Sequence, residues 1–239
     1  GNDRLTVMAL TRLANMHTIN GTPHQAAGLV ERAIELDGGV ERAQGIVLTA
    51  AVNHYTACAE PKRARQVLPH VAPAYARFHD ELGPTYDAFG HGQVTNTEGD
   101  FATARDHFQR AAVLFLALRV PRRRMAATAA MNAVAASVPM GDWPDVISRG
   151  AAWLEEYTDA PPSLTDEVSV RVCLARGARG TPGAWNDLQV WLQRLTSGAV
   201  QLKYWYRERF LKAAAEVAAL NGRAAEVHLI RGLTTDNDA

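Results

Sequence analysis

The chain has 239 residues, of which 47% are hydrophobic and 7% aromatic, and its 25 basic side chains balance its 25 acidic ones. This length can bury a large core, whereas the balanced charge argues against direct nucleic-acid binding, which normally needs a basic excess or stripe. No apolar run reaches the roughly 18 residues needed to span a membrane, and no secretory signal stands at the N-terminus. The two cysteines, Cys58 and Cys173, lie in apolar helical contexts, so we expect free thiols and a reducing cytoplasm.

A helical unit recurs along the chain after six anchor positions. Its clearest copy runs from Gly99 to Ala111, where Phe101, Ala104, Phe108 and Ala111 are spaced by three, four and three residues and share one helical face. The anchors, 38 to 42 residues apart, are Gly21, Ala59, Gly99, Gly141, Gly180 and Gly222. A period near 40 is typical of stacked helical hairpins, and a second apolar helix precedes each anchor. The sequence therefore predicts an all-α fold of twelve helices in six antiparallel hairpins.

Several residues mark where these helices begin or break. Asp100 and Asp142 are good N-caps, and Thr22-Pro23 and Thr181-Pro182 combine an N-cap residue with a first-turn proline. Pro69 and Pro73 fall inside the second helix of the second hairpin, which they should kink or split.

The stretch Gly-Asp-Phe-x-x-Ala-x-x-x-Phe-x-x-Ala at Gly99–Ala111 resembles the second half of a tetratricopeptide repeat (TPR). The period departs from the usual 34 or so residues, and the usual tryptophan and tyrosine of the first helix are mostly absent. The resemblance implies a right-handed α-solenoid of about six hairpins, forming one domain over residues 1–233 with a polar tail at 234–239. Long repeats of this kind resemble the sensor domains of bacterial transcriptional regulators, including those that receive signalling peptides.

In such a stack the first helix of each hairpin lines a concave groove. The face not used within the hairpin lies thirteen, ten, six and three residues before each anchor; in the fifth unit this count gives Glu167, Val170 and Leu174. From the first four units we select ten candidate ligand-binding residues: Asn15, Thr18, Asn53, Thr56, Tyr86, Phe89, Gln93, Asn96, Met131 and Asn132.

Carboxamides recur at one equivalent position of this face, in Asn15, Asn53 and Gln93. A carboxamide both donates and accepts hydrogen bonds, so a ladder of them suits the main chain of an extended peptide. Tyr86, Phe89 and Met131 would then supply apolar pockets. The alternative is that these residues are ordinary polar helix surface.

A second candidate surface is the basic stretch that contains Arg119, Arg122, Arg123 and Arg124. Cations at a helix start oppose the helix macrodipole, so an acidic partner, another domain or a phosphate would explain them. A solvated linker is the alternative.

No pattern indicates catalysis. The sequence contains no nucleophile elbow, phosphate loop or carboxylate pair at an acid/base position, and its eight histidines show no metal spacing and no convincing pairing with a cysteine or another histidine. We therefore expect no catalytic residues, cofactor or metal, and a binding module for a peptide, small ligand or partner protein. A scaffold or oligomerisation domain, including a homodimer, remains the alternative; an enzyme built on helical hairpins is the third hypothesis.

Overall fold

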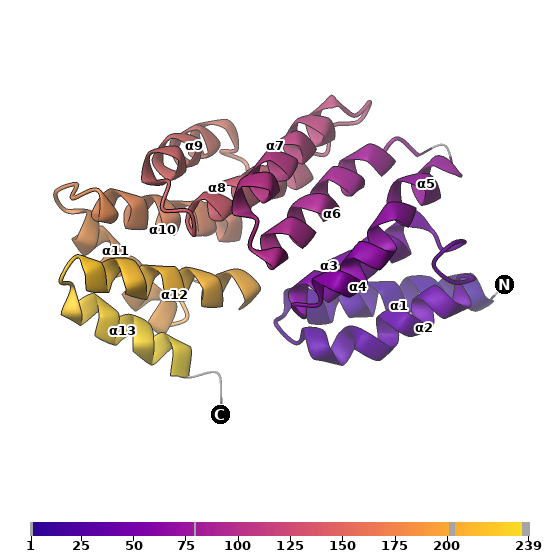
Figure 1. The fold of residues 1–239 in the computed structure, drawn as a ribbon, viewed down its shortest axis with the longest axis horizontal. Helices are drawn as coiled ribbons and strands as arrows, with labels where there is room; N and C mark the ends of the chain where they lie inside the picture. Colours follow the sequence, from indigo (N-terminus) through magenta and orange to yellow (C-terminus); the bar gives the residue numbers. More distant parts are fainter. Residues whose placement is uncertain (1, 79, 201–203, 236–239) are drawn as a thin grey trace. The chain divides into compact units, whose positions relative to one another are not determined.

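The computed structural model describes residues 2–78, 80–200 and 204–235, and all regular elements in those ranges are helical (Figure 1). This confirms the all-α prediction. The first helices of the six predicted hairpins are α1 (Asn2–Ile19), α3 (Gly45–Ala57), α6 (Gly83–Glu98), α8 (Arg123–Ser137), α10 (Pro162–Ala178) and α12 (Tyr204–Leu220). The second helices are η1 with α2 (Pro23–Ala26, Ala27–Leu36), α4 with η2 and α5 (Pro61–Val67, Leu68–His70, Val71–Ala76), α7 (Phe101–Ala117), α9 (Trp143–Glu156), α11 (Ala184–Thr196) and α13 (Ala224–Thr235).

The six anchors share one backbone conformation, which explains why they recur. Each follows the first helix of its hairpin and has a positive φ, which is 88° at Gly99. Glycine adopts this conformation without steric cost. Ala59, with φ of 57°, is the only non-glycine residue with positive φ among the described residues. It occupies the anchor position, which is glycine in the other five units.

Two predicted N-caps, Asp100 and Asp142, are confirmed, Thr22 occupies the predicted N-cap position without a capping bond, and the one at Thr181 is wrong. The carboxylates of Asp100 and Asp142 accept hydrogen bonds from the main-chain N–H groups of Thr103 and Asp145, at 3.2 and 3.3 Å. Thr22 instead shares its hydroxyl with His17, at 3.0 Å from Nδ1, and makes no capping bond. The helix after Thr181 begins only at Ala184, behind a left-handed Gly183.

The prolines split the second helix of the second hairpin, as predicted. The α-helical hydrogen bonding of α4 ends at Val67, a 3-10 turn (η2) carries Pro69, and α5 contains Pro73. A proline lacks the N–H that an uninterrupted α-helix would use.

The chain divides into two compact units, residues 1–133 and 134–239, and the boundary falls within α8. We call them unit 1 and unit 2 and describe each by itself. The sequence suggested one domain over 1–233. Of the predicted polar tail, Thr234 and Thr235 end α13, and residues 236–239 lie outside the described residues.

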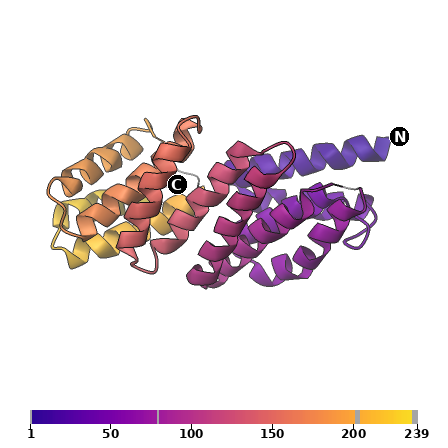
Figure 2. The same cartoon turned by 90° about the horizontal axis from the view of Figure 1, so that it is seen from above.

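In unit 1 the first helices pack in succession, α1 on α3 and α3 on α6, and each also packs on the second helix of its own hairpin. Figure 2 shows α6 and α7 running side by side. They approach closely at Gly92, where a methyl group would lie 2.7 Å from Cδ1 of Phe108. Phe108 in turn packs edge-on against Phe89, with ring centroids 5.6 Å apart.

The core of unit 2 is aliphatic, and includes Leu174, Leu188, Leu192, Leu211 and Ile230. It also encloses an ion pair. Glu167 and Arg171, one turn apart on α10, are 0% and 2% exposed and form a salt bridge.

No described helix combines the length and apolar character that crossing a membrane requires.

Candidate functional site

Within unit 1 the predicted groove face is most open on α3. Helices of unit 1 pack against α3 on several sides, and most of its side chains are buried. The main exception is a strip spaced by three, four and three residues, in which Ile46 is 42% exposed and Thr49, Asn53 and Thr56 are half-buried. These four residues lie thirteen, ten, six and three positions before the anchor Ala59, where the repeat predicts the groove face.

The three carboxamides lie on successive packed helices, Asn15 on α1, Asn53 on α3 and Gln93 on α6. All three side chains are half-buried, and we call them the carboxamide row. The side-chain oxygen of Asn53 is buried and has no hydrogen-bond partner among the described residues. Since a buried acceptor without a partner costs about 1–3 kcal/mol, this oxygen is the one polar group of the row with a clear need for a ligand or water.

Four predicted groove residues lie in the interior instead. Phe89 is 6% exposed and packs on Phe108, and Thr18 is 4% exposed and donates its hydroxyl to the main-chain oxygen of Ala14. Met131 and Asn132 are 0% and 1% exposed. Their placement on a free face is therefore wrong. At Phe89 the reason is that this side of α6 packs on Phe108 and Phe115 of α7.

The remaining groove candidates, Thr56, Tyr86 and Asn96, are half-buried. Thr56 donates to the main-chain oxygens of Val52 and Asn53. The ring of Tyr86 stacks on that of Tyr75 at 5.4 Å, and burial raises the pKa of the Tyr86 hydroxyl. Tyr86 can therefore present an edge to a ligand, with its ring held by its neighbours.

The four arginines of the basic stretch are all exposed. The loop between α7 and α8 is fixed through its main chain: the Arg119 N–H donates to the Glu81 carboxylate at 3.2 Å, and the Arg122 N–H donates to the Phe115 carbonyl at 2.9 Å. Because α8 begins at Arg123, Arg123 and Arg124 stand in its first turn, as the sequence predicts. Whether a partner meets them stays a prediction.

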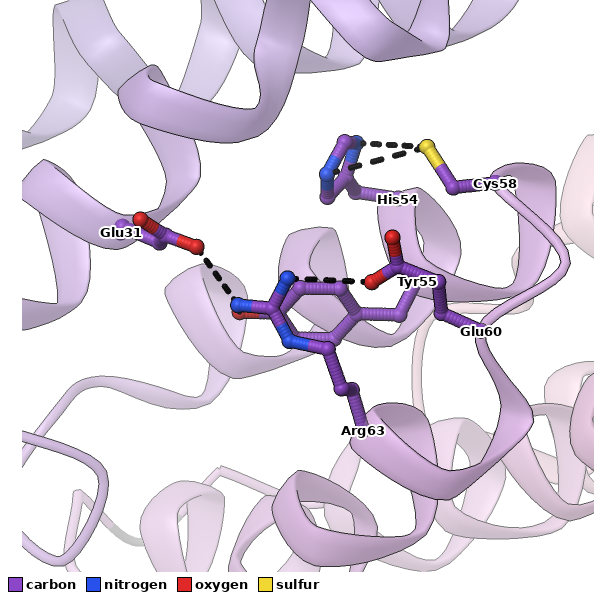
Figure 3. Close-up of polar contacts among 6 residues, drawn as sticks. All are labelled: Glu31, His54, Tyr55, Cys58, Glu60 and Arg63. Carbon is purple, nitrogen blue, oxygen red and sulfur yellow. Dashed lines mark hydrogen bonds and ion pairs between the residues drawn. The ribbon is translucent and has the colours of Figure 1, made fainter.

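A polar cluster that the sequence reasoning missed joins α2, α3 and α4 (Figure 3). The Arg63 guanidinium on α4 binds the carboxylates of Glu31 and Glu60, at 2.6 and 3.0 Å, and its carbon lies 4.3 Å from the centre of the Tyr55 ring. The hydrogen bond to Glu31 is the main cause that raises the pKa of Arg63. Because the charged groups are about half exposed, we assign the pairs at most about 1 kcal/mol each, and the cluster is a clamp between helices.

His54 and Cys58, one turn apart on α3, correct the expectation that no histidine pairs with a cysteine. The Cys58 sulfur lies 3.8 Å from Nδ1 of His54 (Figure 3). Burial lowers the pKa of His54 and raises that of Cys58, so both are neutral at pH 7. A protonated thiol is a poor nucleophile, and the pair offers no catalytic thiolate.

A histidine pair that the expectation about helical spacing does not cover joins α6 and α7. The rings of His91 and His107 stack with centroids 5.1 Å apart, and Asp87 lies 3.9 Å from His91. Burial and the neighbouring His91 lower the pKa of His107. The two residues are sixteen positions apart and lie on different helices of one hairpin, so the spacing within a single helix does not reveal the pair.

These histidines make the stability of unit 1 sensitive to acid. His54 and His107 have folded-state pKa values below the ordinary 6.5, so the unfolded chain binds protons more readily than the folded chain. Their stabilisation is complete above about pH 6.5 and is lost as the pH falls below it. We expect faster amide hydrogen exchange in α3 as the pH is lowered from about 7 to 5, after correction for the intrinsic exchange rate.

Two variants sharpen this measurement. His54→Leu should weaken the pH dependence, whereas replacement of the exposed His228 in unit 2 should leave it unchanged. A corrected exchange rate in α3 that stays constant over this pH range would contradict the prediction.

Among the described residues, no group of three or more histidine, cysteine, aspartate or glutamate side chains is placed to hold a metal ion. Comparison of the chain with protein-family models, with curated proteins and with solved structures gives no match.

Proposed function

We propose that the chain is a TPR-like α-solenoid that binds an extended peptide through the carboxamide row, and that it serves as the sensor domain of a cytoplasmic bacterial transcriptional regulator. The observation that carries the proposal is the unpaired, buried side-chain oxygen of Asn53, in the middle of three half-buried carboxamides on successive helices. The role in a regulator is supported by the resemblance of the repeat to such sensor domains.

The row suits a peptide main chain for a chemical reason. Each carboxamide offers an acceptor and two donors, which match the alternating N–H and C=O groups of an extended backbone. Since each bond contributes a net ~0.5–1.5 kcal/mol, three carboxamides give a modest affinity. Ile46 and Tyr86, which flank the row on α3 and α6, are exposed enough to contact ligand side chains.

The test is a double replacement, Asn15→Ala with Asn53→Ala. Loss of about two such hydrogen bonds should weaken peptide binding by about tenfold or more. Stability should not fall, because Asn53→Ala removes a buried acceptor that has no partner in the described structure. The measurement is affinity selection from a pool of capped random octapeptides, followed by calorimetry with the retained sequences and a thermal melt of each variant.

Gln66→Ala is the matched control, because Gln66 is an exposed carboxamide on α4 outside the row. It should leave binding unchanged. The proposal fails if the unmodified chain retains no peptide, or if the double variant binds the retained peptides as tightly as the unmodified chain.

A scaffold without a small ligand is the second candidate function. The observation that favours it is an exposed apolar face on α1, where Leu5 is 72% and Met16 57% exposed. In that case the chain would bind proteins through α1, and the carboxamide row would be ordinary surface.

A further inference from the structure

Two asparagine–glycine pairs, Asn20-Gly21 and Asn221-Gly222, occupy the same position of the repeat. In each pair the asparagine follows the last residue of a first helix, α1 or α12, and the glycine is the anchor with a positive φ. Both asparagines are exposed. An asparagine followed by glycine is chemically reactive, because no Cβ shields the main-chain nitrogen of glycine from the neighbouring side chain. The two pairs place one reactive dipeptide in two hydrogen-bonding environments.

The anchors share a pattern of main-chain hydrogen bonds that closes each first helix. In all six units the residue after the anchor donates its N–H to the carbonyl five positions before it, at 2.8 to 3.3 Å. In five units the anchor also donates its N–H to the carbonyl three positions before it, at 3.1 Å for Gly222. Such bonds satisfy carbonyls that the end of a helix leaves without partners. Gly21 is the exception, because its N–H has no hydrogen-bond partner among the described residues.

The two asparagine side chains differ in the same sense. The side-chain amide of Asn221 donates to the carbonyl of Val217 at 2.8 Å, one turn back in α12. The side chain of Asn20 forms no hydrogen bond with any described residue. At Asn20 the carboxamide and the following glycine nitrogen are therefore both unrestrained, whereas at Asn221 both are held.

We propose that Asn20 is a site of spontaneous modification, at which the Asn20-Gly21 pair closes to a cyclic imide and then opens to aspartate and isoaspartate. The Gly21 nitrogen loses its proton to solvent and forms a bond to Cγ of Asn20. The bond from Cγ to the side-chain nitrogen breaks, and ammonia leaves with a proton taken from solvent. Water then opens the ring: addition at Cγ gives aspartate, and addition at the main-chain carbonyl of Asn20 gives isoaspartate. The reaction consumes a water molecule and releases ammonia, and nothing is oxidised or reduced.

The modification changes the end of α1 in two ways. Both products carry a carboxylate just after α1, where the negative end of the helix macrodipole disfavours it. Isoaspartate also adds a methylene group to the main chain beside Gly21, which displaces the hydrogen bond from the Thr22 N–H to the His17 carbonyl. Both changes loosen the end of α1, a helix that packs on η1 and α2. This site is independent of the carboxamide row.

The experiment follows both pairs in one sample. The chain is incubated at mildly alkaline pH and physiological temperature in water enriched in heavy oxygen, then digested and examined by mass spectrometry. Each conversion incorporates one heavy oxygen atom, which distinguishes it from any conversion that preceded the incubation. Asn20 should convert at least about tenfold faster than Asn221, because two hydrogen bonds must open at Asn221-Gly222 before it reacts and none at Asn20-Gly21.

Unfolding supplies the matched control. In guanidinium chloride the hydrogen bonds of both pairs are lost, and the two asparagines should react at similar rates, since glycine follows each of them. Gly21→Ala should lower the rate at Asn20 in the folded chain to that of Asn221 or below. Alanine is compatible with an anchor, as Ala59 shows with φ of 57°, and a thermal melt establishes that this variant is folded.

The proposal is overturned if the folded chain leaves Asn20 unconverted, or if it converts Asn221 at least as fast as Asn20. It is also overturned if the ratio of the two rates is the same in guanidinium chloride, because the folded structure then has no part in the selectivity. An unchanged rate at Asn20 in Gly21→Ala would likewise contradict attack by the Gly21 nitrogen. None of these results bears on peptide binding by the carboxamide row, which has its own test.

Discussion

Glu167→Gln is expected to lower the free energy of unfolding of unit 2 by about 3–5 kcal/mol, because it breaks a buried ion pair by removing the negative charge that Arg171 binds. Glu167 is 0% and Arg171 2% exposed, so solvent screens their attraction very little. Glutamine keeps the shape and a hydrogen-bond acceptor but removes the negative charge. The guanidinium of Arg171 would lose this carboxylate and keep its contacts with the main-chain oxygen of Glu167 and with the ring of Phe210, whose centroid lies 5.5 Å away.

Tryptophan fluorescence measures this effect selectively. All five tryptophans, Trp143, Trp153, Trp185, Trp191 and Trp205, belong to unit 2. A urea titration followed by tryptophan emission therefore reports the unfolding of unit 2, and the midpoint should shift to lower urea at an unchanged slope.

A double variant separates the charge from the packing. Glu167→Met with Arg171→Met removes both charges and should recover most of the loss, because buried ion pairs replaced by apolar side chains are often neutral or stabilising. If Glu167→Gln costs less than about 1 kcal/mol, the pair behaves like a solvated surface pair and the buried-charge argument is wrong.

Phe108→Ala is expected to cost unit 1 about 3–5 kcal/mol, the usual range for removing a buried phenylalanine. Phe108 is 1% exposed and lies where α6 and α7 cross. Its ring packs on Phe89 and directly over Gly92, so its loss leaves a cavity that neither helix can close without moving. The measurement is the free energy of unfolding from urea titration followed by amide exchange in α6 and α7.

Gly92→Ala tests the same contact from the other side. In the unmodified chain the added methyl group would lie 2.7 Å from Cδ1 and 2.8 Å from Cε1 of Phe108, and such overpacking costs about 1–3 kcal/mol. With Phe108→Ala already present, the methyl group enters the vacated space and should cost nothing or stabilise. Strict additivity of the two substitutions would contradict this reading of the crossing.

Much of the local structure could be predicted from the residues because its causes are local. The left-handed anchors, the caps at Asp100 and Asp142 and the break at Pro69 and Pro73 all follow from which backbone angles and hydrogen bonds a residue permits. The close approach at Gly92 was also predictable, since a small or medium-sized residue recurs seven positions before each anchor.

The polar contacts of the candidate site were harder to foresee. The Arg63 clamp and the stacked pair of His91 and His107 each join side chains from different helices. Sequence spacing within one helix carries no signal for contacts between side chains of different helices.

By itself, the sequence determined the helices, their turns and the faces that make each hairpin, because the 3.6-residue period and the steric limits on backbone angles act over a few residues. Only the tertiary structure decided which remaining face of each first helix stays open. On α3 the predicted strip is the open one, whereas on α10 the equivalent Glu167, Val170 and Leu174 are 0% exposed and Ser169 and Cys173 are half-buried. The predicted strip and the strip that is half-buried on α10 lie a fraction of a turn apart on the helix. The packing of neighbouring helices decides which of the two stays open.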